Sequence, residues 1–64
     1  MAERSQEGYL IEFRQIGQSV KVSAVDPVSK MEVSIVGAAR APRQQLIQTA
    51  IRKLEYVMKK NNNI

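Results

Sequence analysis

The spacing of apolar residues changes at Pro42, and this change constrains the fold more than any other feature of the chain. Before it, apolar residues recur at every second position in three short runs, as in strands that bury one face. After it, they recur every three or four positions over one long run, as on one side of a helix. We therefore predict an α+β domain with a three-stranded antiparallel β-meander followed by one amphipathic C-terminal helix.

The same pattern sets the expected boundaries within a single domain, residues 1–64. Residues 1–7 show no apolar periodicity, and we expect a lead without regular structure there. The meander is predicted over 8–36, with strands at 9–16, 19–25 and 31–36. The helix is predicted over 42–60, because proline suits the first helical position, and a tail follows at 61–64.

The first hairpin has a well specified register. Gly17-Gln18 suits a two-residue turn, because glycine adopts the positive φ that such a turn requires. This turn places Phe13 opposite Val22, and Ile11 opposite Ala24 on the same face. A slip of one residue would scramble both faces of the hairpin.

The second hairpin has two possible registers of equal parity. Its turn begins at Asp26-Pro27, which suit the first two positions of a type I turn. Ala24 then lies opposite either Met31 or Val33. The longer loop, with Val33 as the partner, requires a left-handed conformation at Lys30 that costs about 1 kcal/mol relative to glycine.

One helix on a small sheet makes a thin core, since a domain of this size buries only about 60% of its unfolded surface. The chain has no cysteine, so disulfides cannot reinforce it, and self-association is the usual alternative. The predicted core combines the inner face of the sheet and the apolar stripe of the helix: Tyr9, Ile11, Phe13, Val20, Val22, Ala24, Met31, Val33, Ile35, Leu46, Ile47, Ala50, Ile51, Leu54, Val57 and Met58.

The residue inventory argues against an enzyme. The chain has no histidine to activate any of its serines, no phosphate-binding glycine motif and no cluster of metal ligands. We therefore expect no catalytic residues, no metal and no cofactor. No apolar run approaches a membrane span of about 18–20 residues, and residues 1–7 lack the features of a signal peptide, so we expect a cytoplasmic protein with no membrane partner.

The outer face of the predicted sheet carries apolar residues as well, and a contiguous apolar patch marks an interface. The candidate interface residues are Leu10, Val25 and Val36. Homodimerisation is therefore the favoured hypothesis, through this face, through sheet edges, or by exchange of the helix across 37–41. A different protein is the other possible partner, and polar substitution of Leu10 and Val25 would test the face.

Charge is distributed unevenly, with a net −1 over residues 1–39 and +5 over 40–64. A basic helix of this kind suggests nucleic-acid binding as an alternative function, or an anion site at its start. The candidate contacts are Arg40, Arg43, Arg52, Lys53, Lys59 and Lys60. The simpler interpretation is a solvated helix face with cations near its C-terminus, where the helix dipole favours them.

Several segments together resemble a family of short uncharacterised alphaproteobacterial proteins that share a domain of unknown function. They are Ile11–Gly17, Val20–Ala24, Asp26-Pro27, Glu32–Gly37 and Arg52–Val57, and the resemblance extends over most of Tyr9–Met58. It implies the same fold and supplies no catalytic or binding residues.

Overall fold

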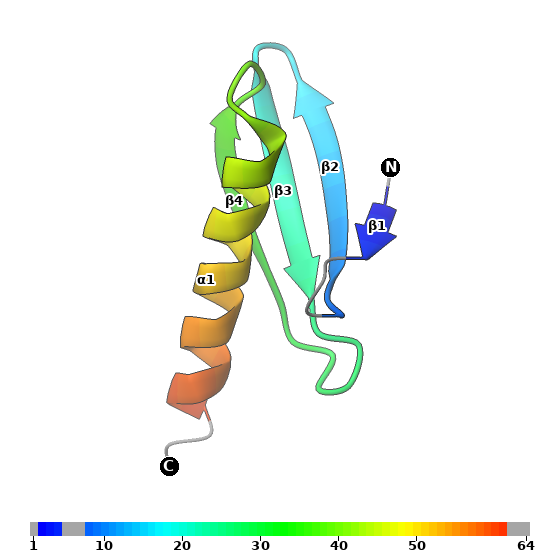
Figure 1. Cartoon of the computed structure of the whole chain (residues 1–64), viewed down its shortest axis with the longest axis vertical. Coiled ribbons are helices and arrows are strands. Elements are labelled where there is room, and N and C mark those ends of the chain that lie inside the picture. The colour runs from blue at the N-terminus through cyan, green and yellow to red at the C-terminus, as the bar shows by residue number, and fades with distance from the viewer. Residues whose placement is uncertain (1, 5–7, 62–64) are drawn as a thin grey trace.

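The chain folds as one helix on an antiparallel sheet (Figure 1), in a computed structural model that describes residues 2–4 and 8–61. The strands are β1 (Ala2–Arg4), β2 (Leu10–Ile16), β3 (Ser19–Val25) and β4 (Glu32–Ala38), in that order across the sheet. Helix α1 spans Arg43–Asn61. The predicted α+β meander followed by one helix is confirmed, with ends that differ by one or two residues.

The structure differs from the predicted lead over 1–7. Ala2–Arg4 forms the short strand β1, in which Ala2 pairs with Glu12 and Arg4 pairs with Leu10. Backbone groups on an open strand edge can bind almost any extended segment, so this pairing needs no apolar alternation in β1. The rest of the predicted lead, residues 1 and 5–7, lies outside the described residues, as does the predicted tail from 62 onward; residue 61 belongs to the helix.

The first hairpin has the predicted register. Phe13 lies opposite Val22, Ile11 opposite Ala24, and β3 begins two residues after β2 ends. Gly17 adopts a φ of 63°, the positive value that the turn requires.

The second hairpin adopts the longer of the two possible loops. Ala24 pairs with Val33, and Lys30 has a φ of 65°. Asp26 organises this loop: its carbonyl accepts a hydrogen bond from the Lys30 N–H at 2.7 Å, and its carboxylate accepts one from the Ser29 hydroxyl at 2.9 Å. These bonds offset the cost of the left-handed lysine.

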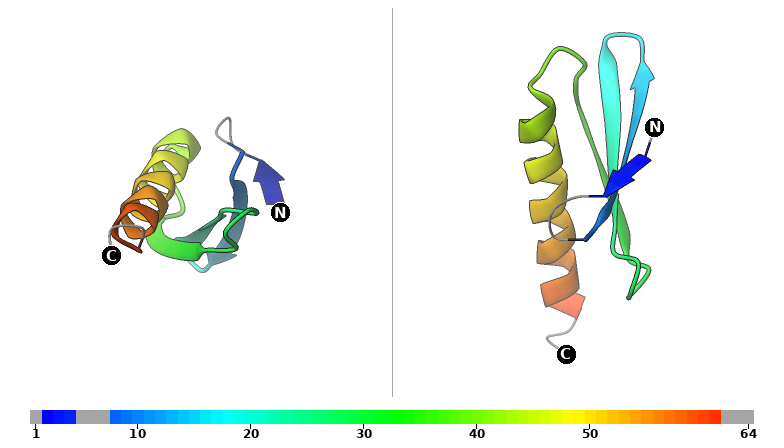
Figure 2. Two further views of the ribbon diagram at one scale, coloured as in Figure 1. Left: turned by 90° about the horizontal axis from the view of Figure 1, so that it is seen from below. Right: turned by 45° about the vertical axis from the view of Figure 1, so that its right-hand side comes forward.

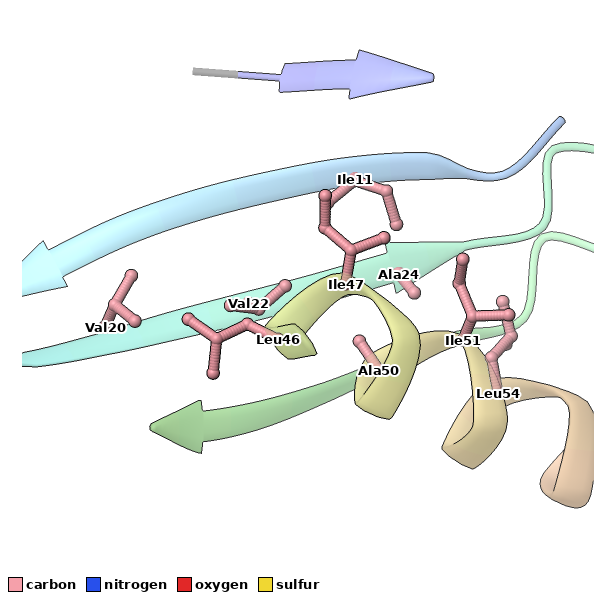
Figure 3. Close-up of a cluster of buried hydrophobic side chains, with 9 residues drawn as sticks. All are labelled: Ile11, Val20, Val22, Ala24, Leu46, Ile47, Ala50, Ile51 and Leu54. Atoms are coloured by element: carbon pink, nitrogen blue, oxygen red, sulfur yellow. The ribbon is translucent and has the colours of Figure 1, made fainter. Parts of the chain in front are cut away.

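The core lies between α1 and the inner face of the sheet (Figure 3), and its buried residues all belong to the predicted core: Ile11, Val20, Val22, Ala24, Leu46, Ile47, Ala50, Ile51 and Leu54. The remaining predicted core residues are only partly buried. The helix packs on β3 and β4 (Figure 1), so Phe13 of β2 lies at the margin of the core.

The helix lies close to the sheet at Gly37 in β4. A Cβ atom placed on Gly37 would lie 2.6 Å from Cδ2 of the buried Leu46 side chain. A side chain at position 37 would therefore displace the first turns of α1 or the Leu46 side chain.

Candidate interaction surfaces

The described part of the chain contributes one helix, and it covers only one face of the sheet (Figure 2). On the other face, the outer face, the observed register aligns side chains from β2, β3 and β4 in four cross-strand rows. In order along the sheet, the rows are Leu10–Val25–Glu32, Glu12–Ser23–Ser34, Arg14–Lys21–Val36 and Ile16–Ser19–Ala38.

Charge on the outer face is separated along the strands. The first and second rows each contain one glutamate, and the third row contains both bases, Arg14 and Lys21. The fourth row is uncharged, and its Ile16 side chain is 63% exposed. Over β2, β3 and β4, the outer face is therefore acidic in its first two rows and basic in the third, with apolar residues in the first and fourth rows.

The structure brings together two of the three predicted interface residues. Leu10 and Val25 are directly opposite each other in the first row. Val36 lies in the third row beside Lys21 and is 72% exposed, so it does not extend the Leu10–Val25 patch. Ile16 is a further exposed apolar residue on this face, and it is apparent in the sequence as the last alternating residue before the Gly17 turn.

The open edge of β4 is partly protected by the helix. Lys53 Nζ donates a hydrogen bond to the backbone carbonyl of Ser34 at 2.9 Å. In an antiparallel ladder, hydrogen-bonded residue pairs alternate with non-bonded pairs. Because the Ala39 N–H donates to the Gln18 carbonyl, Gln18–Ala39 is a hydrogen-bonded pair, and counting along the ladder makes Ser23–Ser34 a non-bonded pair. The Ser34 carbonyl therefore points away from β3, and Lys53 occupies an acceptor that a foreign strand would otherwise use.

A hollow of about 300 Å³ lies on the inner face, between the start of α1 and β2. Its lining includes Phe13, Val20 and Leu46, and the Arg43 guanidinium lies 4.4 Å from the centre of the Phe13 ring. Sequence reasoning missed this hollow, because Phe13 was assigned to the core. The signal that could have shown it is the helical position of Arg43, which lies on the same side as Leu54 eleven residues later.

The six predicted nucleic-acid or anion contacts do not form one row. Arg43 stacks over Phe13, Lys53 binds β4, and Lys60 Nζ lies 5.9 Å from the centre of the Tyr56 ring. Arg52 and Lys59 are seven residues apart on an exposed part of the helix, while Arg40 lies in the loop before it. The cations are thus divided between both ends and two sides of α1.

Neither a metal centre nor a membrane span is found in the part of the chain that the structure describes. Within residues 2–4 and 8–61, no three His, Cys, Asp or Glu side chains are placed to hold a metal ion. The described helix is too polar to cross a membrane.

The described part of the chain is a small open antiparallel sheet with one helix on its inner face, and its outer face carries rows of apolar and charged side chains. The chain belongs to a family named for a domain of unknown function, DUF6898, whose model matches residues 6–61. No curated protein and no solved structure matches the chain.

Proposed function

We propose that this protein is a non-enzymatic homodimeric interaction module in which the outer faces of two sheets pack together. The observation that carries the proposal is the row pattern of the outer face. Acidic and basic rows are adjacent, and apolar residues lie in the outermost rows on both sides of them. Such a surface is complementary to a second copy of itself.

The complementary arrangement has a two-fold axis that crosses the strands between the second and third rows. This axis lays each strand antiparallel on its own counterpart, so that the second row faces the third row of the other copy. Glu12 then faces Arg14 of the second copy, twice by symmetry, and Leu10 faces Ile16 of the second copy. A two-fold interface uses the same patch on both subunits, as this arrangement does.

The other face-to-face arrangement has its axis parallel to the strands. That axis places each row on the same row of the second copy, so Lys21 faces Lys21 and like charges meet at the centre. Because like charges in an interface are unfavourable, the axis across the strands is preferred. Packed sheets usually cross at about 30°, a rotation that keeps these row contacts within reach.

The thin core supplies the reason for pairing. The described helix covers one face only, and Leu10, Ile16 and Val36 are exposed on the other. Burying such residues against a second sheet stabilises both copies by about 25 cal/mol per Å² of apolar surface removed from water.

Two charge-reversal variants test the arrangement. In a dimer of Glu12→Arg, the new arginine of each copy faces Arg14 of the other copy. In a dimer of Arg14→Glu, the new glutamate of each copy faces Glu12 of the other copy. Each variant alone is expected to be monomeric, whereas an equimolar mixture restores both ion pairs and forms a heterodimer. Native mass spectrometry separates the two variants if one carries a mass label.

Arg52→Glu is the matched control, since it reverses one exposed charge on the helix, away from the outer face. It is expected to dimerise like the wild type. The proposal fails if Glu12→Arg keeps the mass of the wild type, or if the two folded variants remain separate when mixed.

A further inference from the structure

One segment of β2 has an edge that β1 does not cover. Strand β1 pairs only with Leu10–Glu12, which leaves the stretch from Phe13 to Ile16 without a neighbour among the described strands on that side. The two-residue turn makes Ile16 and Ser19 a hydrogen-bonded pair, and such pairs alternate along the ladder. The N–H and C=O groups of Phe13 and Gln15 therefore point outward from the sheet.

This edge runs beside the hollow on the inner face. Phe13 and Gln15 both line that hollow, together with the apolar side chains of Val20 and Leu46. A second hollow, of about 420 Å³, adjoins it around Gln15 and Arg40. The outward backbone groups and an apolar recess thus lie side by side, the combination by which sheet edges bind extended peptides.

The segment itself carries one charged residue, the base Arg14, and the acid Glu12 precedes it on the outer face. Arg14 projects to the outer face between Phe13 and Gln15, Arg43 lines the first hollow and Arg40 lines the second. None of the described residues that line the two hollows is acidic. A ligand for this edge is therefore expected to be acidic.

We propose that the Phe13–Ile16 edge binds an extended acidic peptide segment of another protein as an additional strand. Side chains alternate between the two faces of a strand. Residues opposite Phe13 and Gln15 then lie on the inner face beside the hollow and are apolar, while the residue opposite Arg14 lies on the outer face and is acidic. The recognised pattern is apolar–acidic–apolar, with the backbone bonds giving affinity and Arg14 selecting the acid.

The test is a titration of the full chain, labelled with ¹⁵N, with the end-blocked peptide Thr-Leu-Asp-Val-Thr, followed by NMR. Saturable shifts are expected at the amides of Phe13 to Ile16 and around Leu46. The same peptide with lysine in place of aspartate is expected to bind more weakly, because it meets Arg14 with a like charge.

Gln15→Pro removes one outward N–H without touching the β2–β3 ladder, since proline is tolerated on a strand edge where its nitrogen faces away from the neighbour. The loss of the hydrogen bond from this N–H to the peptide is expected to weaken binding about tenfold. Gln15→Ala is the matched control, because it removes the side-chain bond from Gln15 to the Gly17 carbonyl and keeps the N–H.

Three results would overturn the proposal: equal binding by the proline and alanine variants, no saturable shift at millimolar peptide, or preference for the lysine peptide. Concentration-dependent shifts at the same amides without any peptide would also overturn it, since they would show that a second copy pairs with this edge. The peptide and the face-to-face dimer both use Arg14 and would compete for it, and the mass of the dimer is measured separately.

Discussion

Among the described residues other than glycine, Lys30 alone has a positive φ. Its φ of 65° lies in the left-handed region, where a side chain is disfavoured by roughly 1–2 kcal/mol. The sequence left two loops possible here, because both keep the same residues on the inner face. The choice depends on the hydrogen bonds of Asp26, which exist only once the four-residue loop has closed.

Lys30→Gly is therefore expected to stabilise the protein by about 1 kcal/mol, because glycine adopts this conformation without steric cost. Chemical denaturation measures the change. Lys30→Ala is the control for the loss of charge and is expected to have little effect, since it retains a Cβ atom. A gain from alanine equal to the gain from glycine would contradict a conformational origin.

Arg43 shows that a charged residue of the predicted helix can also pack against the aromatic ring of a core residue. Its charge placed it among the candidate nucleic-acid contacts, whereas the structure stacks it over Phe13 at the end of the core. Periodicity analysis counts arginine as polar and cannot register that its aliphatic stem and planar head pack well on an aromatic ring.

At the scale of elements, the register of β2 on β3 could be predicted because the short turn and the apolar alternation agree. Strand β1 could not be predicted, because its pairing depends on backbone groups of β2 and has no apolar signature. The lateral position of α1 was also beyond the sequence. Its apolar stripe is broad enough for several placements, and the close contact between Gly37 and Leu46 is part of the observed one.

Gly37→Ala is expected to destabilise the protein by about 1 kcal/mol, because the added Cβ atom overlaps the Leu46 side chain in a packed core. The free energy of unfolding is to be compared in two backgrounds. In Leu46→Ala, where the overlapping atoms are gone, the same substitution is expected to be neutral or favourable. An equal loss in both backgrounds would place the cause in the β4 backbone instead.

At the scale of the whole molecule, the described helix covers one face of the sheet and not the other (Figure 2). The apolar residues of the outer face could be identified from the sequence by parity alone. Their arrangement could not, because Val36 falls beside Lys21 only in the observed β3–β4 pairing. The β2–β3 pairing, whose register could be predicted, aligns Glu12 with Ser23 and Arg14 with Lys21, and this separation of charge is the basis of the proposed dimer.

The most direct test of that proposal is the solution mass of the wild-type chain, measured by light scattering on a sizing column over a dilution series. The proposed dimer predicts twice the chain mass at high concentration. The mass should fall towards that of one chain on dilution or in the Glu12→Arg variant. A mass of one chain at every concentration would contradict the dimer and leave the outer face without a second copy as its partner.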